Sequence, residues 1–244
     1  MTPASVFMAS SLCHSLVRLV QQASSVSSAT ITSFMQSPSY IKLQNAGKRF
    51  NRDWIFRHFN YQFEKGQSYA ITGPNGSGKS TLLQVLSGAM MLSEGNAKYS
   101  KLDVEYPIEN TYRYISICAP YLEVIEEMTV KELLDFHHGF KPFLPGISTD
   151  AIIASVGLEN AIHKQIRNYS SGMKQRVKLA QCIFSDTPIV LLDEPCTNLD
   201  LPGIDLYHSL IKKYCTDRLV VVSSNDEVEY DFCKEKINIL EYKS

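Results

Sequence analysis

Short apolar runs alternate with helical patterns along most of this chain. The apolar runs are typical of buried strands, and they lie at Tyr40–Leu43, Ser68–Thr72, Tyr114–Ile117, Ile189–Leu192, Leu219–Ser223 and Ile237–Leu240. Apolar residues at helical spacing predict helices at Lys79–Gly88, Met173–Phe184, Leu206–Tyr214 and Asp226–Cys233. Strands that alternate with helices are typical of an α/β domain, in which helices cover both faces of a mostly parallel sheet.

The middle of the chain interrupts this alternation. No strand pattern is convincing between Ile117 and Ile189, and the region from Thr129 to Ile183 is mainly helical. A helical subdomain inserted into the sheet domain, at about residues 120–184, explains this most economically. We therefore predict one α/β domain over residues 39–244 with that insertion.

Residues 1–38 differ from the rest of the chain. They are rich in Ser, Thr and Ala, carry almost no charge, and show a weak amphipathic pattern at Leu12, Leu16 and Leu19. No positively charged region precedes that pattern and no clear cleavage site follows it. Three interpretations stay open: a disordered extension, a targeting segment, or upstream sequence translated from a misassigned start. The last is favoured because Met35 lies just before the first predicted strand.

The composition narrows the classes of protein that fit. At 44% hydrophobic and 20% charged, the 244 residues match an ordinary soluble globular chain. Lys and Arg number 24 against 25 Asp and Glu, a net charge of −1, which argues against a chain that mainly binds nucleic acid. No apolar run approaches the ~18 residues of a membrane span. The six cysteines show no paired spacing, which favours reduced thiols over a disulfide framework or a zinc site.

A glycine-rich segment between a predicted strand and a predicted helix carries the most specific motif. It matches the phosphate-binding pattern G-x-x-x-x-G-K-[ST] at every fixed position. With the residue that follows, it comprises Gly73, Pro74, Asn75, Gly76, Ser77, Gly78, Lys79, Ser80 and Thr81. Glycines let the backbone wrap closely around phosphate oxygens, and a helix N-terminus favours negative charge. We expect Lys79 to reach the β- and γ-phosphates of a nucleotide, and the Ser80 hydroxyl to bind Mg²⁺.

Two carboxylates follow a second apolar strand. Ile189–Leu192 runs directly into Asp193 and Glu194, and the carboxyl ends of such strands are where α/β sheets bind ligands. In a nucleotide site Asp193 would hold Mg²⁺, and Glu194 would accept a proton from the attacking water. The strand and the phosphate loop together predict a site that hydrolyses a nucleotide.

A segment rich in serine stands at the start of the helix that precedes this strand. Its sequence is Tyr169-Ser170-Ser171-Gly172-Met173-Lys174-Gln175-Arg176. This segment is similar to the signature motif of the ATP-binding cassette (ABC) ATPases, from which it departs at Tyr169, Ser171 and Met173. With the phosphate loop and the paired acids, it makes the chain resemble that family. Ser170 and Gly172 are retained, and in that family these positions offer a hydroxyl and a backbone N–H to a γ-phosphate.

The resemblance covers residues 40–240 and implies a fold. That fold is a P-loop NTPase core with a mostly parallel sheet, an antiparallel β subdomain and an inserted helical subdomain. Thr197–Asp200 is similar to the family's D-loop, in which Asp200 would contact an opposite subunit. Phe50 stands at the place of the aromatic that stacks on adenine, and Trp54 is the alternative.

Two departures from the family concern catalysis. The switch histidine is replaced by Asn225, which can hydrogen-bond a γ-phosphate but cannot carry charge or relay a proton. The Q-loop glutamine is absent near Tyr121, where Glu123 is the closest polar candidate. Since the catalytic set keeps Glu194 and Lys79, we expect a slow or partner-dependent ATPase.

The resemblance also implies partners, because the signature motif of one cassette closes on nucleotide held by a second. A homodimer would then bind two ATP molecules with Mg²⁺. The leading hypothesis is the ATP-hydrolysing subunit of a bacterial ABC transporter of the small exporter type, cytoplasmic and peripheral on the inner face of the plasma membrane. A separate membrane-spanning permease would dock on an apolar surface. That surface comprises Tyr121, Leu122, Val124 and Ile125. The alternatives are a soluble ABC ATPase serving an assembly scaffold, as in iron–sulfur cluster biogenesis, and an ATP-gated switch that hardly hydrolyses.

Overall fold

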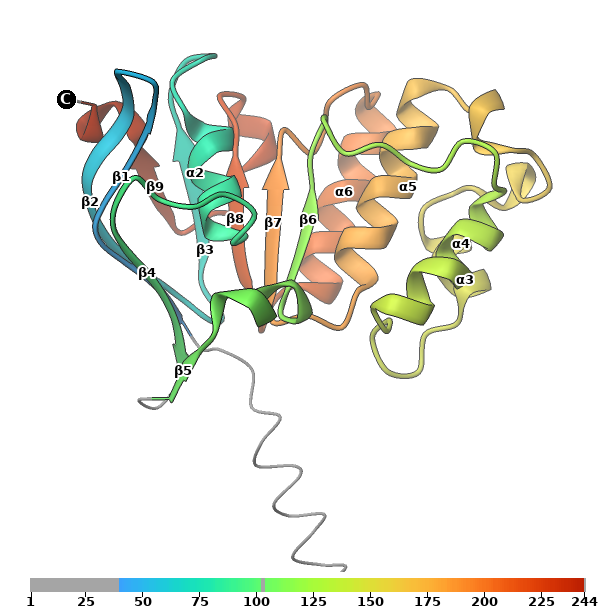
Figure 1. The fold of residues 1–244 in the computed structure, drawn as a ribbon. Helices are drawn as coiled ribbons and strands as arrows, with labels where there is room; N and C mark the ends of the chain where they lie inside the picture. Colours follow the sequence, from blue (N-terminus) through green and yellow to red (C-terminus); the bar gives the residue numbers. More distant parts are fainter. Residues whose placement is uncertain (1–39, 102–103, 244) are drawn as a thin grey trace, which may run out of the picture. The chain divides into compact units, whose positions relative to one another are not determined.

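Two β-sheets and the helices packed on them form the described part of the chain (Figure 1). The computed structural model describes residues 40–101 and 104–243. The segment at residues 1–38, with its three interpretations, lies outside the described residues.

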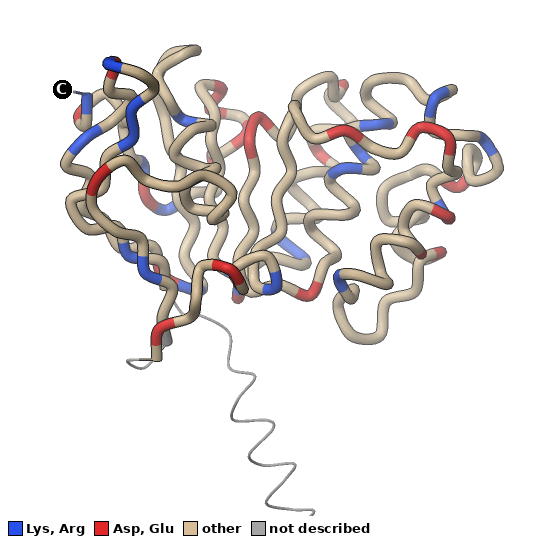
Figure 2. Tube along the Cα trace, in the orientation of Figure 1, with Lys and Arg blue, Asp and Glu red and all other residues tan. Residues whose placement is uncertain are grey.

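A parallel sheet carries the candidate chemistry. Its spatial order is β6 (Ile115–Cys118), β7 (Ile189–Asp193), β8 (Leu219–Ser223), β3 (Ser68–Thr72) and β9 (Glu235–Asn238). Every neighbouring pair is parallel. The strands β3, β6, β7 and β8 carry almost no charged residues (Figure 2). Their one charged residue is Asp193, at the carboxyl end of β7. Such apolar strands need cover on both faces, and the two faces are indeed covered.

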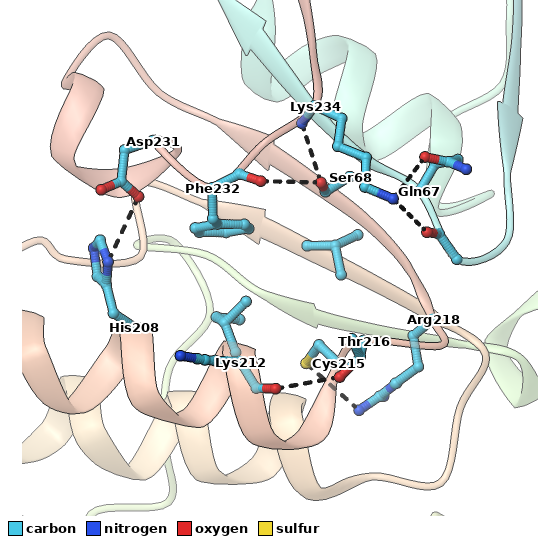
Figure 3. A pocket seen from close by; sticks show the side chains of 13 residues that line it. Gln67, Ser68, His208, Lys212, Cys215, Thr216, Arg218, Asp231, Phe232 and Lys234 are labelled. Atoms are coloured by element: carbon cyan, nitrogen blue, oxygen red, sulfur yellow. Dashed lines mark hydrogen bonds and ion pairs between the residues drawn. The ribbon is translucent and has the colours of Figure 1, made fainter.

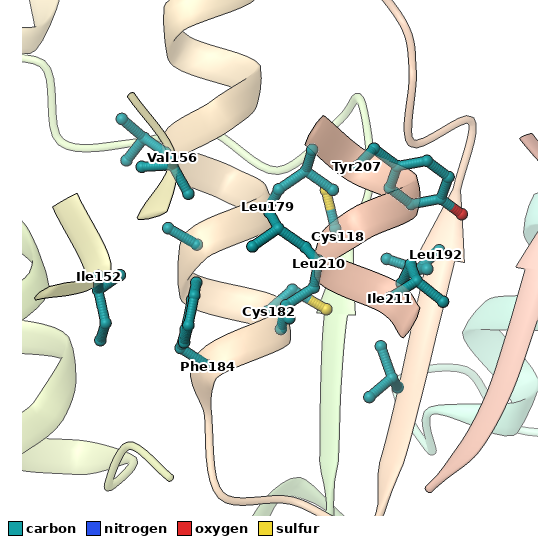
Figure 4. Packing of buried hydrophobic residues seen from close by; sticks show 14 of the residues in the cluster. Cys118, Ile152, Val156, Leu179, Cys182, Phe184, Leu192, Tyr207, Leu210 and Ile211 are labelled. Atoms are coloured by element: carbon teal, nitrogen blue, oxygen red, sulfur yellow. The ribbon is translucent and has the colours of Figure 1, made fainter. Parts of the chain in front are cut away.

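The two faces of this sheet belong to two hydrophobic clusters. Val222 of β8 packs in the cluster of α5 (Ser171–Phe184) and α6 (Leu201–Tyr214), part of which Figure 4 shows. Val221 of the same strand packs in the cluster of α2 (Lys79–Leu86) and the second sheet. This division follows from the two-residue period of a strand. One strand therefore supports helices on both sides.

The second sheet is antiparallel. Its order is β2 (Asp53–Glu64), β1 (Tyr40–Phe50), β4 (Glu94–Lys101) and β5 (Val104–Tyr106), and a 3₁₀ helix, η1 (Ile108–Arg113), follows β5. The β1–β2 pairing changes register at three points, and Asn45, Asn51 and His58 have positive φ. The apolar pattern predicted only the start of β1, because these strands are irregular and half-solvated. The antiparallel β subdomain implied by the resemblance is present.

The helical insertion occupies the chain between β6 and β7. It contains α3 (Val130–Phe140), α4 (Thr149–Ser155), η2 (Glu159–Ala161), η3 (Ile166–Asn168) and α5. Thr129 begins α3 with a capping box, in which the side chains of Thr129 and Glu132 each accept from the other's backbone N–H. The described residues between β6 and β7 form isolated bridges but no strand, as predicted. None of the described helices has the length and apolar character needed to cross a membrane.

Two predictions near the end of the chain are corrected by the structure. The predicted helix Asp226–Cys233 is only a 3₁₀ turn, η4 (Glu227–Glu229). The backbone then leaves the helical path, because Lys234 N–H donates to a carbonyl oxygen of β3 at 3.0 Å. The last strand, β9, begins and ends two residues before the predicted Ile237–Leu240, and η5 (Ile239–Tyr242) follows it.

Candidate functional site

Three strand ends meet at one edge of the parallel sheet. Ser223 at the end of β8 pairs with Ile71 of β3 on one side and with Asp193 of β7 on the other. The contact continues beyond β7, where Glu194 N–H donates to the carbonyl oxygen of Ser223 at 2.9 Å. The phosphate loop, the two acids and the segment that holds Asn225 therefore leave the sheet side by side.

The loop between β3 and α2 requires its glycines. Gly78 has a φ of 106°, and a Cβ there would lie 2.2 Å from Cγ2 of Ile55 on β2. Gly73 also has a positive φ, of 145°. Only glycine combines such a backbone with so close a neighbour. Ser77 Oγ is buried in this loop and has no hydrogen-bond partner among the described residues.

Lys79 is folded into this loop. The residue is 5% exposed, and its Nζ donates to the carbonyl oxygens of Gly73 at 2.8 Å and Pro74 at 3.3 Å. A buried ammonium group needs acceptors of this kind. The contacts hold a positive charge at a helix N-terminus, where an anion binds favourably.

Asp193 is a buried carboxylate close to Ser80. The residue is 2% exposed, and its Oδ1 has no hydrogen-bond partner among the described residues. Burial raises the pKa of Asp193, while the nearby hydroxyls of Ser223 and Ser80 and the charge of Lys79 oppose the rise. An orphaned carboxylate oxygen beside a serine hydroxyl fits Mg²⁺, which prefers oxygen ligands and uses one or two protein carboxylates.

Glu194 and Asn225 lie just beyond the ends of β7 and β8. Glu194 is half-buried, and its φ of 44° is uncommon for a residue with a Cβ. Asn225 is exposed. Ser224 before it turns the chain, since its Oγ accepts from Asp226 N–H at 2.9 Å. Both predicted catalytic side chains are thus placed at the sheet edge that holds Lys79.

The signature segment and the D-loop contact each other within the chain. Ser170 caps α5, since its Oγ accepts from a backbone N–H of the first turn at 3.2 Å. A Cβ on Gly172 would lie 2.8 Å from the carbonyl oxygen of Asn198, so the two backbones approach closely. Arg176 of α5 and Asp200, the N-cap of α6, form an ion pair at 3.4 Å. The structure thus brings together Ser170, Gly172 and Asp200.

Phe50 lies at the end of the β1–β2 hairpin, and its aromatic ring is exposed to solvent. It is 46% exposed, and Lys48 Nζ lies 5.2 Å from its ring centre. Two guanidinium groups lie against the ring of Trp54, those of Arg57 at 4.4 Å and Arg49 at 5.6 Å. Phe50 therefore keeps more free aromatic surface for a stacking ligand than Trp54 does.

The segment after β6 places Tyr121 within reach of the charge of Asp193. Tyr121 is 47% exposed, and the burial of the rest of its side chain raises its pKa. The charge of Asp193 adds to the rise, and the nearby Gln84 side chain of α2 opposes it. Glu123 is exposed and lines cavities beside α5 together with Lys178. Glu123, the closest polar candidate in place of the Q-loop glutamine, stays a prediction, and Tyr121 is a second candidate. From the sequence Tyr121 is predicted only as part of the apolar docking surface, because the Q-loop position in this family holds an amide and a phenol matches no such motif.

A cavity of about 450 Å³ lies at the opposite ends of the strands (Figure 3). It is lined by residues of β3, α6, β8 and the segment before β9, among them His208, Lys212, Phe232 and Lys234. Arg218 at this cavity is buried and donates to carbonyl oxygens at and beyond the end of α5. This arrangement satisfies a helix C-terminus, and the cavity is not the phosphate site.

The comparison with protein families agrees with this geometry. The family model described as ABC transporter matches residues 56–197. The chain belongs to the ABC transporter family. The match includes the phosphate loop, the signature segment and both acids, so the chain is an ATP-binding cassette and a member of that family's ATPases, as its motifs predict.

Relatives and solved structures support the same assignment. The cassette is 30% identical to the uncharacterized ABC transporter ATP-binding protein YybJ of Bacillus subtilis, over 79% of this chain and 89% of that protein. It is 28% identical to the cytochrome c biogenesis ATP-binding export protein CcmA of Agrobacterium fabrum, over 75% of this chain and 87% of that protein. Its fold is similar to a dimeric structure of the bacterial ABC transporter cassette MJ0796, with a TM-score of 0.70, 22% identity, and coverage of 82% of this chain and 94% of that one. The predicted fold class is confirmed.

Proposed function

We propose that this cassette binds and hydrolyses ATP in a bacterial ABC transporter and thereby powers a separate membrane-spanning permease. The observation that carries the proposal is the meeting of Lys79, Asp193 and Glu194 at one edge of the parallel sheet. A buried cation in a glycine loop, an orphaned carboxylate oxygen and a second carboxylate are what a nucleotide-hydrolysing site needs.

The proposed chemistry assigns one task to each side chain. A triphosphate entering the loop would replace the carbonyl oxygens of Gly73 and Pro74 as the partners of Lys79. Ser80 and Asp193 would hold Mg²⁺, which neutralises phosphate charge when bound. Glu194 would accept the proton of the attacking water.

Further contacts would position the nucleotide. Asn225 would donate a hydrogen bond to the γ-phosphate. Phe50 would stack on adenine. Backbone N–H groups from Gly73 to Thr81 would surround the phosphate oxygens.

The proposed site is completed by a second copy of the cassette. Ser170 and Gly172 of one chain would cover the nucleotide bound by Lys79 of the other, and Asp200 would contact the opposite subunit. Ser170 is exposed at the N-terminus of α5, where an anion is favoured. The dimeric structure of MJ0796 supports this arrangement, and a two-fold symmetric dimer would contain two equal sites.

An exposed apolar segment supports the docking of a permease. Tyr121, Leu122 and Ile125 are all exposed, while Val124 packs against the core. Large apolar side chains gathered on a surface mark an interaction site. A cassette held there would be peripheral to the inner, cytoplasmic face of the plasma membrane. The likeness to CcmA favours the small exporter type.

Two alternatives use the same site with a different outcome. A cassette that serves a soluble assembly scaffold, as in iron–sulfur cluster biogenesis, would hydrolyse ATP without a permease. An ATP-gated switch would dimerise when it binds ATP and would hardly hydrolyse it. The presence of Asn225 in place of the family's histidine favours the switch over the scaffold alternative.

The variant Glu194→Gln tests the catalytic proposal. It keeps the size of the side chain and its hydrogen bonds but removes the proton acceptor, so we expect turnover to fall about 100-fold or more. ATP should then trap a dimer, visible by size-exclusion chromatography with light scattering. Glu105→Gln is the matched control, because Glu105 pairs with Lys98 on the surface, outside the candidate site. Equal dimer lifetimes in the wild type and Glu194→Gln would support the switch.

Co-expression with a membrane-spanning permease distinguishes the transporter proposal from the soluble-scaffold alternative. A permease partner should carry the cassette into the membrane fraction. Stable co-purification with soluble scaffold proteins in the absence of any membrane partner would contradict the transporter proposal.

A further inference from the structure

A single peptide group next to Glu194 is held from both ends. Its carbonyl oxygen, that of Pro195, accepts from Gln175 Nε2 at 2.7 Å. Its N–H, that of Cys196, donates to Glu229 Oε1 at 2.7 Å. Gln175 belongs to α5 and Glu229 to η4, so two elements far apart in the sequence hold the same peptide.

Both side chains that hold this peptide are buried. Gln175 is 4% exposed and Glu229 is 5% exposed. Burying an amide or a carboxylate destabilises a protein unless the group is hydrogen-bonded. Glu229 is only partly satisfied, because its Oε2 has no hydrogen-bond partner among the described residues. An apolar side chain in this space would avoid the free-energy cost of burying a partly unsatisfied carboxylate. The presence of the carboxylate therefore points to a functional requirement.

Two other carboxylates lie close enough to Glu229 to disfavour its charged form. Burial raises the pKa of Glu229, and the nearby carboxylates of Asp226 and Glu194 add to the rise. The nearby Ser224 hydroxyl and the hydrogen bond from the Cys196 N–H oppose the rise. The Cys196 N–H is therefore a partner that Glu229 cannot lose without leaving a second buried oxygen unsatisfied.

The held peptide constrains the backbone of Glu194. A φ of 44° is strained for glutamate and persists only where the surroundings over-determine it. On one side, Glu194 N–H is fixed to the carbonyl oxygen of Ser223. On the other side, Gln175 and Glu229 fix the peptide that follows Pro195. Loss of either contact would let the Glu194 backbone relax and move its carboxylate.

We propose that Gln175 and Glu229 are positioning residues for ATP hydrolysis, which together hold the Pro195–Cys196 peptide and thereby the carboxylate of Glu194. The inference deepens the proposed function and rests on the assignment of Glu194 as proton acceptor. The same peptide joins the helix that begins at the signature segment to the turn that follows Asn225. The held peptide therefore connects α5, whose start is expected to face the nucleotide of a partner subunit, with η4, which follows the residue expected to face the nucleotide bound by the same chain.

The holding of the peptide can be measured without nucleotide. In the full chain, Glu229→Leu should accelerate hydrogen exchange of the Cys196 amide about tenfold or more, read by NMR. Glu229→Gln should keep most of the protection, because its amide oxygen can still accept. Glu227→Leu is the matched control, since Glu227 lies in the same turn but pairs with Lys236 on the surface. Unchanged exchange in Glu229→Leu would overturn the proposal.

The catalytic consequence is measured by steady-state ATP hydrolysis. Glu229→Leu and Gln175→Leu should each lower kcat about 10- to 100-fold, the effect of losing one hydrogen bond of this kind. The ATP KM should stay within about threefold, since neither side chain touches the nucleotide. Glu229→Gln should retain most of the activity. The two residues reach the peptide from opposite sides, so Gln175→Leu decides the question if Glu229→Leu does not fold.

A double-mutant cycle separates positioning from general damage. In the background of Glu194→Gln, neither Glu229→Leu nor Gln175→Leu should lower the residual turnover further, because both act through Glu194. A further drop of the same size as in the wild type would overturn the proposal. If the wild type hydrolyses no ATP, or Glu194→Gln has no effect, the proposed function fails instead, and the amide-exchange measurement still decides whether the peptide is held.

Discussion

The Nζ atom of Lys79 donates to the carbonyl oxygen of Gly73 at 2.8 Å, so this lysine closes the phosphate loop upon itself. An ammonium group bound in this way can exchange a backbone carbonyl for a phosphate oxygen with little movement. The exchange replaces a neutral acceptor with a charged one, and such charge-assisted hydrogen bonds are about twice as strong.

The first prediction concerns Lys79→Ala. Loss of the ammonium group should weaken ATP binding about 10- to 100-fold, because a hydrogen bond to a charged group is removed. Isothermal titration calorimetry with Mg-ATP measures the change. Lys98→Ala is the control, since Lys98 pairs with Glu105 on the surface. An affinity that survives Lys79→Ala unchanged would contradict the proposed nucleotide site.

The second prediction concerns Asn225. We expect Asn225→Ala to lower kcat about tenfold, because one hydrogen bond to the γ-phosphate is lost in the transition state. Asn225→His should raise kcat above the wild-type value, since imidazole can carry charge and relay a proton. Phosphate release under saturating ATP measures both. A slower Asn225→His enzyme would show that the asparagine does not limit turnover.

The third prediction concerns Tyr121. Tyr121→Phe removes only the hydroxyl that lies near Gln84 and Asp193, and we expect kcat to fall about three- to tenfold at unchanged ATP affinity. Tyr121→Gln should restore part of the loss, because glutamine offers donors and acceptors at the same place. Tyr112→Phe, on an exposed residue of η1, is the control. Identical kcat in Tyr121→Phe and the wild type would remove Tyr121 from the site.

The fourth prediction concerns pH and His137. Burial, with the charges of Lys141 and His138 adding to it, lowers the pKa of His137 from 6.5 to about 4. Between these values the unfolded chain binds more protons than the folded one, so the free energy of unfolding should decrease as pH falls from about 6.5 to 4. Neutral His137 bridges Ser185 Oγ at 2.9 Å and Gln181 Nε2 at 3.3 Å.

Urea unfolding over this pH range tests the effect. His137→Gln should flatten the difference profile against the wild type, because the titrating group is gone. His163→Gln, at an exposed position, should leave the profile unchanged. A wild-type slope that persists in His137→Gln would assign the dependence to other groups.

Some parts of the fold were predictable because they leave a local pattern. The predicted strand Ile189–Leu192 appears as β7 with one residue added, since an uninterrupted apolar run is typical of a strand buried on both faces. β4 was not predicted, because Glu94–Lys101 mixes charged and apolar residues. Helix α6 begins five residues before the predicted Leu206, at Leu201, because Asp200 caps it before the apolar spacing starts.

Some residues of the candidate site also follow local sequence motifs, and others do not. The phosphate loop and the paired acids follow local sequence motifs, so residues such as Lys79, Asp193 and Glu194 could be named from the sequence. Gln175 and Glu229 act through contacts to a peptide 20 and 33 residues away, and no local motif reports such a contact. Tertiary packing alone identifies them.

The cap on α5 leaves the signature serine with unused bonding capacity. Ser170 Oγ accepts a hydrogen bond from the Met173 N–H of the helix, and the hydroxyl proton remains available for donation. A hydroxyl in this state can meet a phosphate oxygen from a sister molecule without breaking the start of its own helix. Assembly of two copies would therefore demand no local unwinding at this serine, and separation would leave the helix intact for the next encounter.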